Sequence, residues 1–349
     1  MTIEIAGRPI GPKHRPFVIA EMSGNHNQSL DRALAIVEAA AQSGAHAIKL
    51  QTYTAETMTL DLRGGSFEIT DPNSLWAGQN LHNLYKQAYT PWEWHAPIMN
   101  RAQELGLICF SSPFDETAVD FLEDLGAPAY KIASFENNHL PLIEKAASTG
   151  KPLIISTGMA SLGELEQAVT TARSSGCQNL ILLKCTSTYP ATPESTNIRT
   201  IPHLRELFGC EVGLSDHTMG LGVAIAAAAL GATVIEKHFT LSRSDGGVDS
   251  AFSSEPTELA ELVAETERAW LALGEVSYGP SEAEMKSLVF RRSIYVAQDI
   301  AEGELFSSEN LRIVRPGDGA SPSLLNQIIG KKSKRAFTKG EPLSLGKLF

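Results

Sequence analysis

The sequence has few cysteines, and none of them has the spacing of a zinc-binding pair. Its four cysteines are Cys109, Cys177, Cys185 and Cys210, and no two of them form a Cys-x-x-Cys pair. Structural zinc sites commonly use such pairs, and disulfide frameworks occur in small secreted domains that are rich in cysteine. We therefore expect reduced thiols, as in a cytoplasmic protein.

Long apolar runs and basic clusters are missing as well. The longest apolar run, residues 223–230, is too short to cross a membrane. The first residues, Met1-Thr2-Ile3-Glu4, lack the basic segment and apolar stretch of a signal peptide. The formal net charge is -11, and no long run of lysine or arginine is present. We expect neither a membrane nor a nucleic acid as partner, and a cytoplasmic location.

What the sequence does contain is a regular series of short apolar runs. Eight of them have the length and composition of buried strands, and they cover residues 17–22, 47–52, 107–112, 129–134, 152–157, 180–186, 211–217 and 233–240. Amphipathic segments of helix length, such as 29–43 and 257–273, separate most of them. The alternation predicts a parallel sheet, and eight such units in about 250 residues predict a closed (β/α)₈ TIM barrel.

An open, doubly wound sheet is the alternative arrangement of such units. That fold usually carries a glycine-rich phosphate loop directly after its first strand. Here the first strand is followed by Ser23-Gly24-Asn25-His26-Asn27, which does not fit the fingerprint. The sequence therefore favours the closed barrel.

The turn residues divide the chain into parts. Gly7, Pro9, Gly11 and Pro12 predict a hairpin within residues 1–16 that closes the bottom of the barrel. The polar segment 64–80 follows the second strand, so we expect a long loop on the active face. We assign residues 1–274 to a catalytic barrel, 275–290 to a linker and 291–349 to a small second domain. Because that domain is near the lower size limit for stability, we expect it to dock on a partner surface.

Each predicted strand becomes polar at its carboxyl end, where barrel enzymes place their chemistry. His217 and His238 end neighbouring strands, which run about 4.8 Å apart, so both imidazoles are expected to reach one ion. Two histidine ligands leave positions for water and substrate, as a catalytic divalent metal requires. Glu236 shares the face of His238 by the two-residue period and is expected to point inward too.

Lysines are concentrated at the same ends. Strand alternation turns some of them outward, and we expect Lys237 to be an ordinary solvated lysine. The remaining lysines and four hydroxyls are expected to bind a phosphate and a carboxylate: Lys49, Lys131, Lys184, Ser112, Ser134, Ser156 and Ser215. Lys131 and Ser134 differ by an odd number of positions, so both can face inward only if the strand ends before Ser134.

At these residues the chain resembles the sialic acid synthase family. The resemblance covers nearly the whole chain and rests on motifs in order: AEMSGNHNQSLD (20–31), KLQTYT (49–54), AYTPWEWH (88–95), FSSPFDETAVDFLE (110–123), YKIASFE (130–136), STGMA (156–160), KCTSTYP (184–190), GLSDHT (213–218), IEKHFT (235–240) and RSDGGVDSAFS (243–253). The end of the chain, with Arg315-Pro316-Gly317, resembles the antifreeze-like (SAF) domain of that family.

The resemblance implies an activity. Members of the family condense phosphoenolpyruvate with an open-chain acetamido sugar aldehyde and release phosphate. The motifs at 88–95 and 110–123 are most similar to the branch whose acceptor is 2,4-diacetamido-2,4,6-trideoxy-L-altrose. The N-acetylneuraminate and legionaminate branches are the alternatives. The family also implies a homodimer in which the SAF domains are swapped.

The resemblance further implies roles for individual residues. His217 and His238 match the ligands of Mn²⁺, Mg²⁺ or Co²⁺, and Glu21 matches a catalytic carboxylate. Residues matching phosphoenolpyruvate contacts are Ser112, Lys131, Ser134, Ser156 and Ser215. Residues matching the surroundings of the acceptor are Lys49, Gln51, Tyr189 and Asp249. Ser187 stands at a further contact, where the sialic acid branch carries Asn. Arg315 matches an arginine that reaches the site of the partner subunit.

Two other functions use the same residue types. In a sugar-acid aldolase, Lys131 would form a Schiff base with pyruvate, and the histidine pair would have no role. A non-catalytic sugar-binding protein would keep the cavity but not need Glu21 or the histidines. All three residues are present.

Overall fold

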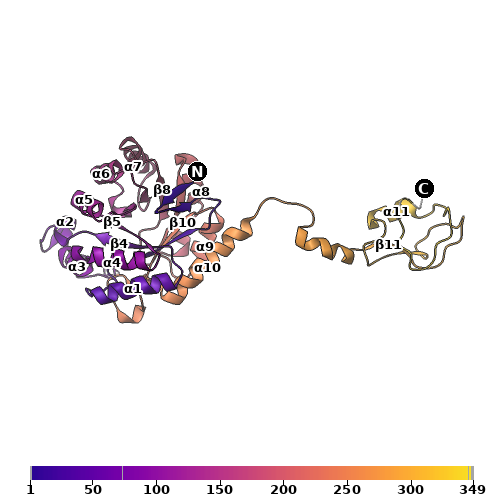
Figure 1. Cartoon of the computed structure of the whole chain (residues 1–349), viewed down its shortest axis with the longest axis horizontal. Coiled ribbons are helices and arrows are strands. Elements are labelled where there is room, and N and C mark those ends of the chain that lie inside the picture. Colours follow the sequence, from indigo (N-terminus) through magenta and orange to yellow (C-terminus); the bar gives the residue numbers. More distant parts are fainter. Residues whose placement is uncertain (1, 73, 345, 347–349) are drawn as a thin grey trace. The chain divides into compact units, whose positions relative to one another are not determined.

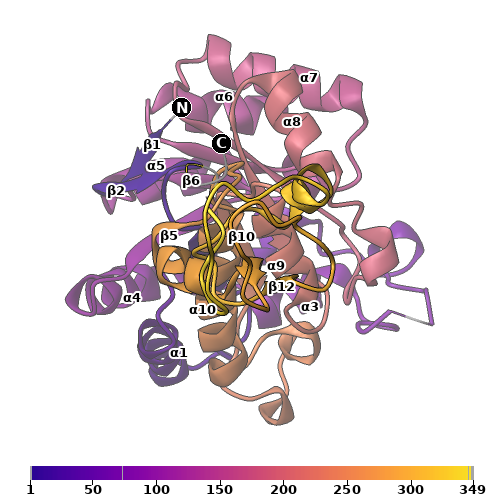
Figure 2. The same ribbon diagram turned by 90° about the vertical axis from the view of Figure 1, so that its right-hand side faces the viewer.

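Eight parallel strands close into a barrel in the computed structural model, which describes residues 2–72, 74–344 and 346 (Figures 1 and 2). The strands are β3 (Phe17–Glu21), β4 (Ala47–Thr52), β5 (Ile108–Pro113), β6 (Tyr130–Ile132), β7 (Leu153–Ser156), β8 (Leu180–Cys185), β9 (Glu211–Asp216) and β10 (Val234–His238). They pair in chain order, and β10 pairs with β3 to close the barrel. Every predicted strand overlaps an observed one, so the predicted TIM barrel is confirmed.

Helices cover the outside of the strands, as Figures 1 and 2 both show. They are α1 (Leu30–Gln42), α4 (Trp92–Glu104), α5 (Glu116–Asp124), α6 (Leu140–Ser148), α7 (Leu162–Ser174), α8 (Thr200–Phe208), α9 (Gly222–Ala229) and α10 (Pro256–Leu273). The start of α1 is fixed by Ser29, whose side chain accepts a hydrogen bond from the Arg32 backbone N–H. Its apolar face, which includes Ile36 and Val37, is buried.

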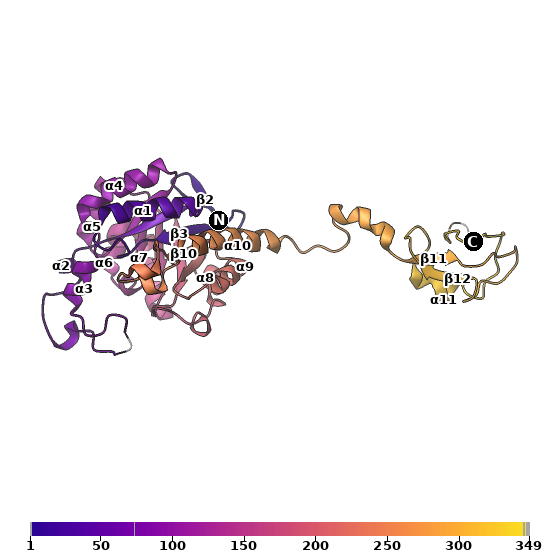
Figure 3. The ribbon, with the colours of Figure 1, turned by 90° about the horizontal axis from the view of Figure 1, so that it is seen from below.

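The segment after β4 leaves the regular strand–helix pattern. A short helix, α2 (Ala55–Met58), and a longer one, α3 (Leu81–Ala88), lie at its two ends. Between them the chain makes a long excursion away from the strands, with one 3₁₀ turn at Gly65–Phe67 (Figure 3). The predicted loop at 64–80 is therefore present.

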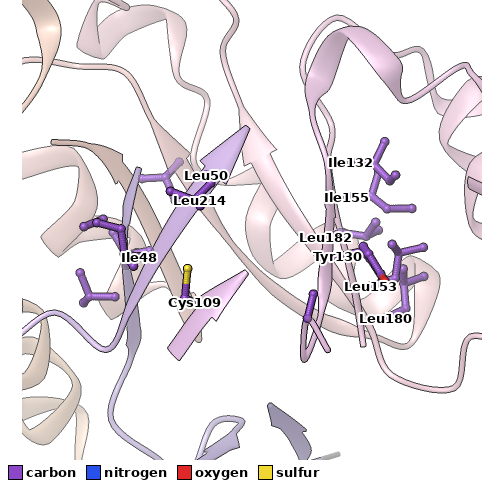
Figure 4. Close-up of a cluster of buried hydrophobic side chains, with 14 of the residues drawn as sticks. Ile48, Leu50, Cys109, Tyr130, Ile132, Leu153, Ile155, Leu180, Leu182 and Leu214 are labelled. Carbon is purple, nitrogen blue, oxygen red and sulfur yellow. The ribbon is translucent and has the colours of Figure 1, made fainter. Parts of the chain in front are cut away.

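Apolar side chains point outward from the strands and pack under the helices. Ile132, Ile155 and Leu182 are register partners on β6, β7 and β8 and form part of this layer (Figure 4). Leu50 on β4 and Leu214 on β9 belong to the same layer. Because successive side chains on a strand alternate between faces, the neighbours of these residues point into the barrel.

A hairpin closes the lower end of the barrel interior. β1 (Ile3–Ile5) pairs with β2 (Arg8–Ile10) in antiparallel fashion. Ile3, Ile5 and Ile10 are buried in one apolar cluster with residues of the strands, among them Phe17 and Ile154. The hairpin predicted from the turn residues is confirmed, and it seals the end opposite to the carboxyl ends of the strands.

The chain divides between Gly274 and Glu275 into two units. The second unit contains a 3₁₀ segment (Glu282–Phe290), β11 (Ser293–Val296), β12 (Leu311–Val314) and α11 (Leu325–Ile328). It has an apolar core of its own, which includes Ile294, Phe306 and Phe337. Within the described part of the chain, no helix has both the length and the apolar character needed to cross a bilayer.

Candidate active site

A cavity of about 490 Å³ opens at the carboxyl ends of the barrel strands. All but three of the predicted site residues line it: Glu21, Lys49, Gln51, Lys131, Ser134, Ser156, Ser187, Tyr189, Ser215, His217, His238 and Asp249. Its size is within the usual range for small-molecule sites. Its polar lining residues come mainly from the strands and their ends. Apolar residues line it as well, among them Met58, Ile69, Trp76, Leu81 and Leu84 from the segment between β4 and α4.

Glu21 and Lys49 form an ion pair at the base of this cavity. The Lys49 Nζ lies 2.5 Å from Glu21 Oε2, and Gln51 Nε2 donates to Glu21 Oε1 at 2.9 Å. The two residues are register partners on β3 and β4. Lys49 and Gln51 both face the cavity because they are two positions apart on one strand. The strands therefore hold the carboxylate between two donors.

A second ion pair lies beside the first. Lys131 Nζ donates to Ser156 Oγ at 2.7 Å and lies 3.7 Å from Glu236 Oε1. Lys49 Nζ is 3.9 Å from the same Glu236 oxygen, and Ser215 donates to it at 3.4 Å. Two lysines, two carboxylates and two hydroxyls thus share one buried cluster. Such a cluster can bind an anion with more than one acidic group.

Burial and neighbouring charges give the two carboxylates, Glu21 and Glu236, different pKa values. Burial raises the pKa of Glu21 to about 7, against the opposing effect of Lys49. Burial alone would also raise the pKa of Glu236, but the charges of Lys131 and Lys49 outweigh it, and the pKa of Glu236 is lowered. Glu21 can therefore exchange a proton near neutral pH, whereas Glu236 stays ionised.

Ser134 reaches the cavity because β6 is short. The strand ends at Ile132, and Ser134 begins a 3₁₀ turn that ends at Glu136. Strict alternation stops there, so Lys131 and Ser134 both line the cavity. The Ser134 hydroxyl accepts a hydrogen bond from the Gly158 backbone N–H at 3.2 Å. The condition set by the sequence, that the strand ends before Ser134, is met.

His217 and His238 lie side by side, with ring centroids 5.3 Å apart. His217 Nδ1 is 2.9 Å from the Thr186 carbonyl oxygen, so Nδ1 carries a proton, and Nε2 is the nitrogen that can bind a metal ion when the ring is neutral. His238 Nδ1 is buried without a hydrogen-bond partner. Burial, followed by the charge of His217, lowers the pKa of His238 well below its usual value, so this ring is neutral.

The pair has the donor chemistry that a divalent metal needs from imidazole ligands. Among the residues that the structure describes, no group of three His, Cys, Asp or Glu side chains is placed to hold a metal ion. An ion here would take two protein nitrogens and complete its coordination with water and substrate oxygens. The residues fit an open, catalytic type of metal site rather than a closed, structural one.

Hydrogen bonds join the segment after β3 to the loop after β10, next to the two histidines. Asn25 Nδ2 donates to the Phe239 carbonyl oxygen at 2.9 Å and to Ser253 Oγ at 2.8 Å. Asn27 Nδ2 donates to the Gly246 carbonyl oxygen at 3.1 Å. Gly247 has φ +132°, and a Cβ there would lie 2.5 Å from Asn27 Oδ1. The segment after β3 therefore fixes the loop after β10.

Lys184 and Lys237 both point away from the cavity; the outward side was expected for Lys237 but not for Lys184. Lys184 Nζ donates to the Cys185 carbonyl oxygen at 2.7 Å and does not line the cavity, so its predicted part in the anion site was wrong. Lys237 does face outward, but it is buried and pairs with Asp216 Oδ2 at 2.8 Å. It is not solvated, because helices and loops cover the outer face of a barrel strand.

Besides Lys184, the predicted site residues outside the cavity lining are Ser112 and Arg315. Ser112 lies behind Lys49 and accepts a hydrogen bond from its Nζ at 3.2 Å. Its place is therefore support for a lysine rather than direct contact with the cavity. Arg315 belongs to the second unit, where it is exposed. Its predicted reach into a partner subunit stays a prediction.

Several residues that line the cavity were not predicted from the sequence. Glu136 lines the cavity, and burial raises its pKa to about 7. Cys185 has its Sγ 3.9 Å from His217 Nδ1. Both stand inside the motifs YKIASFE and KCTSTYP, so a signal was available for them. Trp76 and Ile69 stand in a loop without periodic pattern, and no signal in the sequence marks them.

Comparison with known proteins gives consistent matches over most of the chain. The model of the NeuB family matches residues 36–278, and that of the SAF domain matches residues 291–348. Pseudaminic acid synthase of Campylobacter jejuni is 43% identical over 330 residues, which are 95% of this chain and 96% of that protein. N,N'-diacetyllegionaminic acid synthase of the same species is 35% identical over 335 residues, with 94% of this chain and 98% of that protein covered.

A solved structure with a similar fold is the N-acetylneuraminic acid synthetase of Leptospira borgpetersenii in complex with citrate. It is 33% identical, with a TM-score of 0.73, and the match covers 82% of this chain and 95% of that one. A truncated 3-deoxy-D-arabino-heptulosonate 7-phosphate synthase of Thermotoga maritima is 16% identical with a TM-score of 0.58, which shows the shared barrel fold alone.

Proposed function

This chain belongs to the NeuB family, and we propose that it is a nonulosonic acid synthase. In this function it condenses phosphoenolpyruvate with an open-chain acetamido sugar aldehyde and releases phosphate. The family membership rests on a model match over residues 36–278 and on the relatives described above. The proposal of the substrates and of the chemistry rests on the residues that line the cavity.

The observation that carries the proposal is the buried cluster of Lys49, Lys131, Glu21 and Glu236. Phosphoenolpyruvate carries a carboxylate and a phosphate, and a small cavity that binds it needs buried cations. The two lysines supply that charge, and Ser134, Ser156 and Ser215 add hydroxyls. Held in this way, the anion is oriented for reaction and shielded from its own repulsion.

The reaction forms one carbon–carbon bond and breaks one carbon–oxygen bond. C3 of phosphoenolpyruvate attacks the aldehyde carbon, and the aldehyde oxygen gains a proton to become a hydroxyl. Positive charge develops at C2, where water adds and loses a proton. Phosphate then leaves from C2 with the electron pair of the C–O bond, while the new C2 hydroxyl loses its proton and becomes the keto oxygen. Glu21, with its pKa near 7, is suited to accept the proton of the water or of a sugar hydroxyl.

His217 and His238 would hold a divalent metal ion, for which we propose Mn²⁺, Mg²⁺ or Co²⁺. When bound, such an ion polarises the sugar aldehyde as a Lewis acid. The available Nε2 of His217 and the unpartnered Nδ1 of His238 support this assignment. Asp249 Oδ2 lies 3.9 Å from that Nδ1 and is placed to orient the ring or the acceptor.

For the acceptor we propose 2,4-diacetamido-2,4,6-trideoxy-L-altrose, which makes the chain a pseudaminic acid synthase. The higher identity to pseudaminic acid synthase than to the legionaminic acid enzyme of the same species supports this choice. We also propose a cytoplasmic, domain-swapped homodimer, in which Arg315 of each chain completes the cavity of the other. The resemblance of the second unit to a SAF domain supports the swap.

The direct test is phosphate release by the purified protein with phosphoenolpyruvate and a panel of sugars. We expect release with 2,4-diacetamido-2,4,6-trideoxy-L-altrose and weak or no release with N-acetylmannosamine. A site that pairs with the second acetamido group should reject a sugar that lacks it, because buried polar partners stay unmet. Equal kcat/KM for both sugars would overturn the acceptor. Borohydride trapping of a pyruvate adduct on Lys131 would instead favour the aldolase.

A further inference from the structure

We propose that one buried lysine, Lys237, sets the distance between the two histidines of the metal site and so determines how tightly the site binds its ion. Lys237 precedes His238 in the chain, and its ammonium group is bonded to the residues on either side of His217. It is a positioning residue, because its side chain lies outside the cavity lining and acts through the two histidines. The inference rests on the proposed function, from which it takes His217 and His238 as metal ligands.

The ladder between β9 and β10 ends before the histidines. Its last pair of register partners is Lys237 with Asp216, and β9 itself ends at Asp216. β10 continues to His238, which is the register partner of Glu21 on β3. His217 therefore lies one residue beyond the last pair of the ladder, and its distance from β10 depends on other contacts.

Lys237 supplies those contacts with two hydrogen bonds. Its Nζ donates to Asp216 Oδ2 at 2.8 Å and to the Thr218 carbonyl oxygen. Asp216 Oδ1 in turn accepts from the backbone N–H of Thr218 at 2.9 Å and from its hydroxyl at 2.7 Å. The three residues form one closed set of bonds around the backbone of His217. His217 can therefore move relative to β10 only if these bonds break.

The other hydrogen bonds of His217 lead to a different part of the barrel. Its Nδ1 donates to the Thr186 carbonyl oxygen at 2.9 Å, and its own carbonyl oxygen accepts from the Ala191 N–H at 3.0 Å. Thr186 and Ala191 both belong to the segment after β8. These bonds orient the imidazole, whereas the bonds of Lys237 tie its backbone to the strand that carries His238.

The Asp216–Lys237 pair is buried on the outer side of the strands. The two side chains are 1% and 2% exposed, neither lines the cavity, and the proposed reaction uses neither. Replacing such a buried pair by apolar residues of similar volume is often neutral or stabilising, so stability alone does not account for it. Hydrogen bonds between charged groups are short and directional, so they can fix the distance between two strand ends.

Metal affinity depends on the spacing of the two imidazoles before the ion binds. Loss of a partner that orients a metal ligand typically costs about 10–100-fold in metal affinity. We expect the same range for loss of the Asp216–Lys237 pair. Binding of phosphoenolpyruvate should not change, because Lys49 and Lys131 are held by other contacts.

The experiment measures Mn²⁺ binding by calorimetric titration in four proteins. They are wild type, the double variant Asp216→Asn/Lys237→Met, the milder variant Thr218→Val and the control double variant Arg205→Met/Glu211→Gln. The first double variant removes both charges together, so neither stays buried without its partner. Thr218→Val keeps both charges and removes the hydroxyl bond to Asp216. The control removes an ion pair at the opposite end of β9, where Arg205 Nη2 lies 3.2 Å from Glu211 Oε2.

We expect the control to bind Mn²⁺ like wild type. The Asp216→Asn/Lys237→Met variant should lose about 10–100-fold in affinity, and Thr218→Val about 2–10-fold. Saturating Mn²⁺ should restore the kcat of both variants to within a few-fold of wild type, with an unchanged KM for phosphoenolpyruvate. A general loosening of the fold would not be corrected by added metal.

Wild-type affinity in the folded Asp216→Asn/Lys237→Met variant would overturn the role of Lys237, as would an equal loss in the control. If that variant does not fold, Thr218→Val decides by the same criterion. Activity that saturating Mn²⁺ fails to restore would also contradict a positioning role. Absence of Mn²⁺ binding by wild type would overturn the proposed metal site itself, and this inference with it.

Discussion

Ser23 and Asp249, 226 positions apart in the sequence, are joined by a hydrogen bond from the Ser23 hydroxyl to the Asp249 carboxylate. Ser23 follows the first barrel strand, and Asp249 stands in the loop after the last one. The bond places the carboxylate 3.9 Å from His238 Nδ1. Ser23 has φ +46°, a conformation that few residues other than glycine adopt. The geometry makes Ser23 a positioning residue for Asp249.

We expect Ser23→Ala and Ser23→Gly to weaken use of the acceptor. Loss of a hydrogen bond to a charged group should lower kcat/KM for the sugar by about 10–100-fold. The KM for phosphoenolpyruvate should not change, because the side-chain contacts of Asp249 are with Ser23 and His238. Ser23→Gly keeps the left-handed backbone accessible, so it separates strain from the hydroxyl. Ser244→Ala, in the same loop, is the control, and equal losses in all three variants would contradict the role.

Glu21→Gln tests the carboxylate itself. The amide preserves the shape of the side chain but cannot take up a proton. We expect kcat to fall by about 10²–10⁴-fold with little change in melting temperature. Steady-state phosphate release and thermal unfolding of the same preparation measure the two effects. A near-normal kcat would refute a role in chemistry.

The pH dependence should report the raised pKa of Glu21. The base must be ionised to act, so kcat/KM should rise with pH up to about 7 and level off above it. The free energy of unfolding should change with pH in the opposite direction. Between about pH 4.5 and 7, Glu21 binds more protons in the folded protein than in the unfolded chain. Its contribution to stability therefore falls as the pH rises through this range. Glu136 also has a pKa near 7 and needs its own control. In Glu136→Gln, the remaining kcat/KM should still rise with pH up to about 7. In Glu21→Gln, this rise should be absent.

Removal of divalent metal should abolish turnover. The proposed ligands are His217 and His238, and Mn²⁺, Mg²⁺ or Co²⁺ should restore activity to the chelated protein. Calorimetric titration with Mn²⁺ measures binding separately from turnover. We expect His217→Ala and His238→Ala to lose binding, while His203→Ala, on α8 outside the cavity lining, should retain it. Full activity after complete chelation would contradict the metal site.

Mixed dimers test whether Arg315 acts on the partner subunit. Arg315→Ala and His238→Ala homodimers should each be nearly inactive. In a mixed dimer, the cavity with intact His238 belongs to the Arg315→Ala chain and receives its arginine from the other chain. One of two sites is then complete, and random pairing makes half of the dimers mixed. Co-refolding should therefore recover about a quarter of wild-type activity. Mixed dimers that form and stay inactive would contradict action in trans.

The barrel could be predicted because its strands repeat at regular intervals with helices between them. The inward face was predictable only where polar residues mark it, as in Lys49 and Gln51 on either side of Leu50. On β8 both faces are apolar up to Lys184, since both faces of a barrel strand are buried. The hydrophobic pattern therefore does not reveal which alternate set faces inward, and Lys184 was assigned to the wrong side.

Loop residues are harder to predict for a different reason. Trp76 takes its place from a hydrogen bond to Val248, 172 positions away, and no local pattern encodes such a contact. Ser134 was a conditional prediction, because strand length decides whether alternation continues. The tail domain was recognisable from its turns and from Arg315, but which chain it serves depends on assembly rather than on local sequence.

The hairpin of β1 and β2 determines the side from which the cavity is reached. Among the described residues, Ile3, Ile5 and Ile10 fill the lower end of the barrel, so a ligand reaches the cavity from the carboxyl ends of the strands. If the proposed substrates bind there, we expect the one held by the buried lysines to enter before the one bound nearer the opening, and to leave after it.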